Sequence, residues 1–428
     1  MNENKIEPGG WLVVGLMFFF MLINFADKAI IGLAAVPIME ELKLTPTQFG
    51  LVGSSFFLLF ALSSIVVGFI CNHVQARWVL LVMGVIWALA QFPMVGTVSL
   101  TTLIACRVVL GAGEGPAYPV ALHATYKWFP NELRTLPTAI IAQGAGIGIM
   151  VALPLLNLII VRYSWHWAFA ALGIAGLLWS FAWALLGREG RLAQSEAAQP
   201  VGERIPYGRL LLNPTIIASW CAFFGAYWAL SLSLSWQAAY FVQGLGFAQG
   251  QAGPLTAITS GLGVIIVIGL GWYSQRMMAR GVSSRLARGC LGGACVAIGG
   301  VAMVSLPLID NITLRVMVGA FGMSLPSVIY VITHAIVGEI TPAGQRGALL
   351  AIGNAIGTMA GLLAPYVMGS LVENAATPLQ GFNRGFVVCG MVMFAGGIIG
   401  MLFMRPERDA RRLAMAQIPV GAVTLAKG

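Results

Sequence analysis

The chain has 428 residues, of which 58% are hydrophobic and only 9% are charged, and its mean hydropathy is +0.86. Because soluble domains carry about 25% charged residues, this composition excludes an ordinary soluble protein and predicts an integral membrane protein. The net charge of +9 does not by itself indicate nucleic-acid binding, since basic residues also accumulate in cytoplasmic loops. The six cysteines form no CxxC pair, so neither a disulfide framework nor a metal site is indicated.

Twelve apolar runs of about 20 residues follow one another along the chain, and each is long enough to cross a hydrocarbon layer of about 30 Å. They lie at roughly 11–36, 48–71, 78–97, 99–128, 136–160, 166–187, 212–240, 252–275, 287–308, 312–338, 346–371 and 383–404. The first run is too long for a signal-peptide core and lacks a clean cleavage site, so it predicts a retained span. The expected fold is an all-α membrane protein with twelve transmembrane helices in two six-helix pseudo-repeats.

The longest polar stretch, 188–211, separates the first six runs from the last six. We therefore expect an N-terminal bundle at 1–187, a cytoplasmic linker at 188–211, a C-terminal bundle at 212–404 and a cytoplasmic tail at 405–428. A short motif supports a repeat of the two halves: Pro130-x-x-x-Arg134 follows span 4, and Pro342-x-x-x-Arg346 follows span 10, with an offset of 212 residues.

The basic residues predict the orientation. With the N-terminus inside, 18 of the 24 lysines and arginines fall in cytoplasmic segments, four fall in outside loops, and two lie within spans. This asymmetry predicts a multi-pass protein of the inner or plasma membrane with both termini in the cytoplasm.

Span 4 contains the stretch RVVLGAGEGPAYP, in which Arg107 and Glu114 are separated by two helical turns and so lie on one helix face. Charges within a membrane helix are costly and indicate function by default. Glu114 and Asp27 of span 1 are the only acids deep within the predicted spans. Burial favours a protonated carboxyl and a nearby arginine favours an ionised one. A movable Arg107 would thus switch proton affinity, although a fixed structural ion pair remains the alternative.

Several motifs resemble the major facilitator superfamily, over essentially the whole chain. Gly68 and Arg77 fit its GxxxDRxGRR loop, although Asn72, His73 and Gln75 depart from that pattern. Arg107, Gly111 and Gly113 fit its RxxxGxG motif. Within the superfamily, three features resemble the anion:cation symporter family of sialin, vesicular glutamate and phosphate carriers, and bacterial sugar-acid and aromatic-acid permeases. These features are Asp27-Lys28, then Glu114 with Pro116 and Pro119, and finally Lys127-Trp128-Phe129-Pro130 with Glu132 and Arg134.

The resemblance implies that Asp27 and Glu114 couple protons with the help of Arg107, and that Lys28 stands where the family has an arginine that contacts the substrate carboxylate. Lysine keeps the charge but lacks the bidentate fork, and Lys28 could instead only balance Asp27. Whether Arg107 pairs with Asp27 or with Glu114 stays open at this point.

The sequence predicts no buried charge in the second half, which is rich in polar groups. Tyr330 and His334 lie four residues apart on one helix face, and His334 either contacts substrate or packs against a helix. Buried amides and hydroxyls need partners, so candidate substrate contacts are also Gln143, Asn354 and Thr358. Phe25 and Phe60 stand where sugar-acid carriers of the family can have tyrosines, which favours a small or aromatic carboxylate over a polyhydroxylated one.

These features predict a proton-coupled symporter of an organic carboxylate, working by alternating access. We expect small organic anions and protons as its partners within the lipid bilayer, a monomer, no cofactor and no nucleic acid. The alternative is a proton-coupled antiporter that exports a metabolite or drug, which the absence of a Gly-Pro motif in span 5 disfavours. A receptor or a membrane enzyme is the third possibility, but no nucleophile–base pair or phosphate loop is visible in the sequence.

Overall fold

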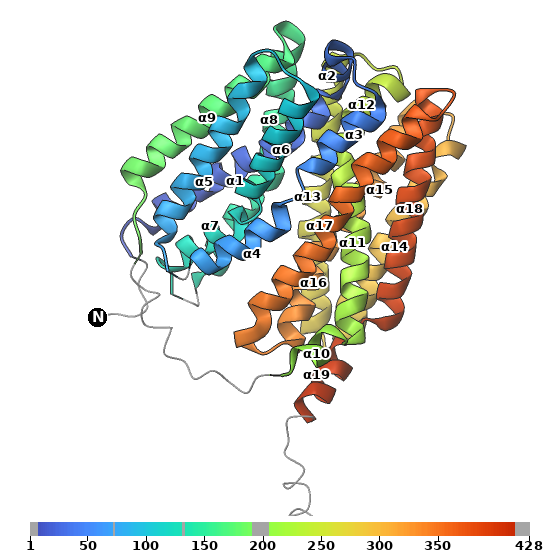
Figure 1. Ribbon diagram of the computed structural model, residues 1–428. Coiled ribbons are helices and arrows are strands. Elements are labelled where there is room, and N and C mark those ends of the chain that lie inside the picture. The colour runs from blue at the N-terminus through green and yellow to red at the C-terminus, as the bar shows by residue number, and fades with distance from the viewer. Residues whose placement is uncertain (1–6, 72, 131–132, 191–204, 416–428) are drawn as a thin grey trace, which may run out of the picture. The chain divides into compact units, whose positions relative to one another are not determined.

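The computed structural model describes residues 7–71, 73–130, 133–190 and 205–415, and within these ranges the chain is helical without any strand (Figure 1). The motif residues Asn72 and Glu132, and most of the predicted linker, lie outside the described residues. The longer helices are α1 (Gly10–Leu33), α2 (Ala35–Leu42), α3 (Pro46–Ser55), α4 (Phe60–Ile70), α5 (Ala76–Gln91), α6 (Leu100–Glu114), α7 (Ala117–Tyr126), α8 (Thr135–Arg162), α9 (Trp165–Leu186), α11 (Pro214–Ser235), α13 (Gln249–Ala279), α14 (Leu291–Ser305), α15 (Ile312–Ser324), α16 (Val328–Ile340), α17 (Ala343–Glu373), α18 (Pro378–Phe403) and α19 (Pro406–Met415). Short elements complete the chain: α10 (Tyr207–Leu211), α12 (Gln237–Ala239), the 3-10 turns η1 (Phe92–Val95), η7 (Leu306–Leu308) and η8 (Leu325–Ser327), and the π-helical turns η5 (Tyr240–Gly244) and η6 (Arg285–Cys290).

Eleven helical segments of the described chain are long and apolar enough to cross a membrane. They coincide with eleven of the twelve predicted runs. The remaining run, 99–128, consists of α6 and α7, which have 15 and 10 residues and are separated by Gly115 and Pro116. The all-α membrane fold is therefore confirmed, with span 4 broken near its middle.

Proline explains two of the helix breaks. Pro116 separates α6 from α7 in span 4, and Pro326 lies in η8 between α15 and α16 in span 10. A proline cannot donate the backbone hydrogen bond that an uninterrupted helix needs, and its ring clashes with the preceding turn. Spans 4 and 10 hold corresponding places in the two predicted repeats. Each half therefore has a discontinuous helix at the same place in its repeat.

The chain packs as two compact units. The first contains 1–199, 230–264 and 361–385, and the second contains 200–229, 265–360 and 386–428. The helices of the second half thus contribute to both units. The sequence division into bundles at 1–187 and 212–404 concerns the two repeats, whereas these units are defined by contacts in space. The bundle boundaries therefore remain a prediction.

In the first unit, glycines set how closely the helices approach. A Cβ atom at Gly111 of α6 would overlap the backbone carbonyl oxygen of Phe56, and one at Gly115 would overlap that of Phe60. Only glycine permits such an approach. The segment between α3 and α4 consequently lies directly on α6.

At one end of the first unit, the Glu189 carboxylate joins three helix ends. It accepts hydrogen bonds from the backbone N–H groups of Ala76, at 3.4 Å, and Arg77, at 3.1 Å, and it forms an ion pair with Lys127. A carboxylate is favourable at a helix N-terminus because the exposed N–H groups carry partial positive charge. Glu189 therefore fastens the beginning of α5 to the end of α7 and to the segment after α9.

Candidate functional site

The four intramembrane charges predicted from the sequence all lie in the first unit and all are buried. Asp27 and Lys28 project from α1, and Arg107 and Glu114 project from α6. Asp27 and Glu114 are each only 1% exposed. All four groups interact electrostatically with one another, so they form a single cluster, which we call the charge cluster.

Within the charge cluster, Lys28 is the cation that pairs with Glu114. Its Nζ atom lies 3.4 Å from Glu114 Oε2 and donates a 2.6 Å hydrogen bond to Oδ1 of Asn24. The ammonium also lies over two aromatic rings, 4.4 Å from the ring centroid of Phe25 and 5.2 Å from that of Phe60. Lys28 is therefore held by an anion, an amide and two ring faces.

Arg107 pairs with neither carboxylate in the described chain. Its guanidinium donates a 3.3 Å hydrogen bond from Nη1 to the backbone carbonyl of Asp27, and its Cζ lies 4.6 Å from the ring centroid of Phe56. Its Nε is buried without a hydrogen-bond partner among the described residues. The question that the sequence left open is thus answered: the acid on its own helix, Glu114, is neutralised by Lys28 instead.

Asp27 retains hydrogen-bonding capacity, because its Oδ1 atom is buried and unpartnered in the described structure. The Gln91 side chain at the end of α5 is 2% exposed and lies close enough to interact with this carboxyl, while its Nε2 atom makes no regular hydrogen bond. A buried polar group without a partner is costly. These two side chains therefore keep unused hydrogen-bonding capacity inside the first unit.

Sequence reasoning did not identify Asn24 or Gln91. Asn24 precedes Lys28 by four residues and so lies on the same helix face, a spacing that could have revealed it. Gln91 lies within the apolar run 78–97 with no charged neighbour in sequence, and only the folded arrangement of the helices brings it to Asp27.

The local structure explains why the charges are enclosed. Phe56 and Phe60, which cover Arg107 and Lys28, come from the segment that Gly111 and Gly115 allow onto α6. Glu114 is the last residue of α6, directly before the break at Pro116. The glycine spacing and the helix break together produce an aromatic cover over an ionic pair.

The second unit brings Tyr330 and His334 together, as predicted. Tyr330 donates a 3.0 Å hydrogen bond from its hydroxyl to the carbonyl of Ala226 on α11, and its backbone carbonyl contacts Nδ1 of His334. Both rings lie near Phe223, with centroid distances of 5.2 and 6.4 Å. His334 itself is exposed, so it is not packed inside this unit.

The other three residues predicted to contact substrate make few interactions with other helices of the described chain. Gln143 on α8 in the first unit and Asn354 on α17 in the second are half-buried. Thr358 is 2% exposed, and its hydroxyl donates to the Ala355 carbonyl of its own helix, at 2.9 Å. Their role in substrate binding stays a prediction.

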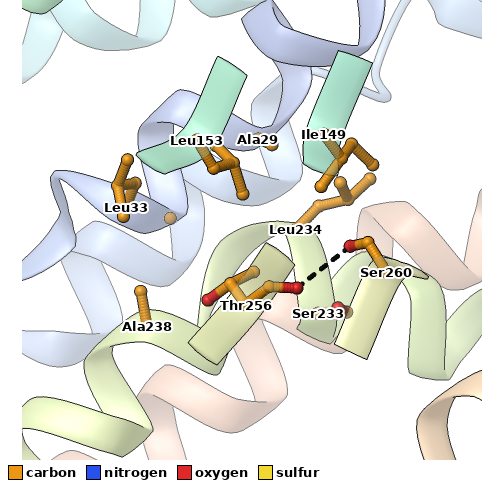
Figure 2. Close-up of a pocket in the computed structure, with 10 residues that line it drawn as sticks. Ala29, Leu33, Ile149, Leu153, Ser233, Leu234, Ala238, Thr256 and Ser260 are labelled. Carbon is orange, nitrogen blue, oxygen red and sulfur yellow. Dashed lines mark hydrogen bonds between the residues drawn. The ribbon is translucent and has the colours of Figure 1, made fainter. Parts of the chain in front are cut away.

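A small pocket lies in the first unit, one turn beyond Lys28 (Figure 2). It is lined by Gly32 and Leu33 of α1, Ile149 and Leu153 of α8, Ser233 of α11 and Thr256 of α13, among others. Its volume of about 10 Å³ would hold about one water molecule. The helix faces that border it are therefore closed to an organic anion in this conformation.

Polar contacts hold these same helices together beside the pocket. The Asn157 amide of α8 donates to the carbonyls of Gln249 and Gly250 at the beginning of α13, at 3.0 and 2.9 Å. Gln249 in turn donates to the carbonyl of Leu33 at the end of α1, at 2.9 Å. This end of the first unit is thus held together by hydrogen bonds from two side-chain amides.

Comparison with known proteins places the chain in a family. Residues 17–328 match the Major Facilitator Superfamily. The chain is 25% identical over 407 residues to the hexuronate transporter of Bacillus subtilis, covering 92% of this chain and 94% of that one. It is 27% identical to a probable sulfoacetate transporter of Cupriavidus necator (92% and 94% covered) and 24% identical to the D-galactonate transporter of Escherichia coli (94% and 97%).

Solved structures show the same fold. A bacterial homologue of the human lysosomal transporter Spinster superposes with a TM-score of 0.77 at 17% identity, covering 95% of this chain and 99% of that one. A D-xylose–proton symporter superposes with a TM-score of 0.74 at 15% identity (93% and 98% covered). The chain therefore belongs to the Major Facilitator Superfamily, and it is a membrane transporter rather than an enzyme.

Proposed function

We propose that the protein is a proton-coupled symporter of an organic carboxylate that works by alternating access. The observation that carries the proposal is the Lys28–Glu114 ion pair, 3.4 Å long and buried beside an unsatisfied Asp27 carboxyl. Buried ionisable groups within membrane spans indicate ion pathways and proton relays. The relatives named for hexuronate, galactonate and sulfoacetate support an anionic substrate.

The ion pair links proton binding to anion binding. While Glu114 is ionised, it neutralises Lys28, and a substrate carboxylate would have to compete with it. Protonation of Glu114 removes that competitor, so a proton raises the affinity of Lys28 for an anion, and the anion equally raises the affinity of Glu114 for a proton. This reciprocity is the thermodynamic requirement for symport.

Arg107 and Asp27 supply a second proton-sensitive pair in the proposal. Arg107 is held by a backbone carbonyl and the Phe56 ring rather than by a carboxylate, so its charge would become available to Asp27 after a small movement of α6 against α1. A buried arginine near an acid favours the ionised form of that acid. Such a movement would release a proton from whichever carboxyl it approaches.

The surroundings of Lys28 support a substrate with few hydroxyl groups. Phe25 and Phe60 flank the ammonium and offer no hydrogen bonds to a polyol. We propose further contacts from Gln143 in the first unit and from Tyr330, His334, Asn354 and Thr358 in the second.

Proteoliposome uptake tests the function. We expect an inward proton gradient to drive accumulation of labelled sulfoacetate, and to drive that of the polyhydroxylated glucuronate and galactonate less strongly. Asp27→Asn and Glu114→Gln should abolish this accumulation while keeping exchange of labelled for unlabelled substrate, because exchange needs no net proton movement. Glu40→Gln, which neutralises an exposed acid on α2, is the matched control and should behave like the wild type. Unchanged acid-driven uptake in both variants would remove the assignment of proton coupling to Asp27 and Glu114. Substrate efflux driven by an inward proton gradient would establish the antiport alternative.

A further inference from the structure

We propose that a groove between α10 and α19 binds the phosphate headgroup of an anionic phospholipid through Arg209 and Arg412. The groove belongs to the second unit, has a volume of about 430 Å³ and is lined by α10, the beginning of α11 and α19. Figure 1 shows α10 and α19 next to each other at the end of that unit. The inference does not depend on which substrate the protein transports.

The groove lies where two membrane spans end. The span of α11 begins at Pro214, which lines the groove, and the span of α18 ends at Phe403, three residues before α19. Leu212 in the groove is 77% exposed and Phe403 is 52% exposed. Apolar side chains exposed at the end of a span favour contact with acyl chains, so the basic side chains of the groove stand at headgroup level.

The charge of the groove is positive. Arg209 and Arg412 are both exposed, and neither side chain forms an ion pair or hydrogen bond with another residue in the described ranges. Asp409, the acid in the lining, is already engaged: Oδ1 accepts from Arg408 at 2.8 Å and Oδ2 accepts from Thr215 at 2.7 Å. The two free guanidiniums therefore lack a local anion, and guanidinium is well suited to bind phosphate oxygens in pairs.

Hydrogen bonds within the protein hold the walls of the groove in place. Asp409 fastens α19 to the first turn of α11 through Thr215, and Glu407 accepts a hydrogen bond from the backbone N–H of Ser284. The buried Asn213 side chain uses its Oδ1 atom to accept from the backbone N–H groups of Thr215 and Ile216. Asn213 is itself one of the residues that line the groove.

A lipid fits these features better than a soluble anion does. A free phosphate would use the arginines but not the exposed Leu212, whereas a phospholipid matches both the charge and the apolar edge. Basic pockets between helices at the cytoplasmic face are a known chemical type of lipid headgroup site, and the positive-inside pattern of the sequence predicts that this face is cytoplasmic.

Native mass spectrometry of the full-length protein in detergent, titrated with phosphatidylglycerol, tests the proposal. Each arginine near an anionic lipid contributes about 1 kcal/mol, or about a fivefold share of the affinity. We therefore expect the double variant Arg209→Gln/Arg412→Gln to bind phosphatidylglycerol about 30-fold more weakly. The matched control is Arg411→Gln/Arg280→Gln, which removes the same charge from two exposed arginines outside the groove, and it should bind like the wild type.

Two further ligands separate the possible sources of the phosphate. Phosphatidylcholine should bind weakly to all variants, and glycerol phosphate should not displace bound phosphatidylglycerol. Equal losses in the groove variant and in the control would show diffuse electrostatics and overturn the site. Displacement by glycerol phosphate at similar concentrations would show a soluble ligand and overturn the lipid assignment. Unchanged melting temperatures without lipid would confirm that the variants are folded.

Discussion

The Lys28 ammonium lies 3.4 Å from the Glu114 carboxylate, and both side chains are at least nine-tenths buried. Removal of one partner leaves the other charge uncompensated, which typically costs about 3–5 kcal/mol for a buried pair. Removal of both charges avoids that cost.

We therefore expect Glu114→Gln and Lys28→Met each to lower the free energy of unfolding by about 3–5 kcal/mol, and the double variant to recover most of the loss. Unfolding in detergent, analysed as a double-mutant cycle, measures this coupling. Additive losses in the double variant would contradict a direct ion pair. The comparison also tells a folding defect from a transport defect in the uptake experiments.

Gly111 provides a second test, because a Cβ there would overlap the Phe56 carbonyl. We expect Gly111→Ala to destabilise the protein by about 1–3 kcal/mol through overpacking and to weaken the aromatic cover over Arg107. Gly15→Ala is the control: it also lies within a helix, but a Cβ there would have no atom within 4 Å. It should be neutral or stabilising by up to about 1 kcal/mol. Equal melting temperatures for the two variants would refute the close approach.

Asp409, which lies outside the membrane spans, should make the stability of the protein depend on pH. Burial alone would raise the pKa of this carboxyl, but hydrogen bonds from Arg408 and Thr215 lower it below its usual value. A lowered folded-state pKa means that the ionised group stabilises the protein above the unfolded-state pKa of about 4, and that this contribution is lost as the pH falls below it.

Thermal unfolding from pH 7 to pH 3 checks this sign. We expect the wild type to be more stable than Asp409→Asn at pH 7, and the difference to shrink below about pH 4. Glu40→Gln, which neutralises an exposed acid on α2, is the control for the effect of the substitution type. A difference that stayed constant down to pH 3 would show that the charge of Asp409 is unimportant.

Glu189 allows charge and hydrogen bonding to be separated. Glu189→Gln keeps an oxygen that can accept from the N–H groups of Ala76 or Arg77 but loses the ion pair with Lys127. We expect a loss of about 0.5–1 kcal/mol for the glutamine variant and roughly twice that for Glu189→Ala. Chemical denaturation ranks the two. Identical values would mean that the carboxylate only contributes its charge.

The sequence predicted the spans well because lipid permits little else: an apolar run of about 20 residues must form a helix that satisfies its own backbone. It also predicted that Asp27, Lys28, Arg107 and Glu114 are buried, because all four lie within apolar runs. It did not predict that Lys28 rather than Arg107 would meet Glu114, because that choice depends on the rotation of α1 against α6. Gln91 had no sequence signal for the same reason. Pro116 can be seen in the sequence, but the apolar run 99–128 predicts one continuous helix, so the break itself is not predicted.

The zero net charge of the four-residue cluster has an electrical consequence. In the proposed mechanism, with Asp27 and Glu114 ionised and Lys28 and Arg107 protonated, the empty carrier would reorient without moving charge through the membrane field. Binding of one proton and one monovalent anion preserves that neutrality, so transport at this stoichiometry would be insensitive to voltage. A second proton would add one positive charge, and the membrane potential would then contribute about 2.3 kcal/mol per 100 mV to accumulation.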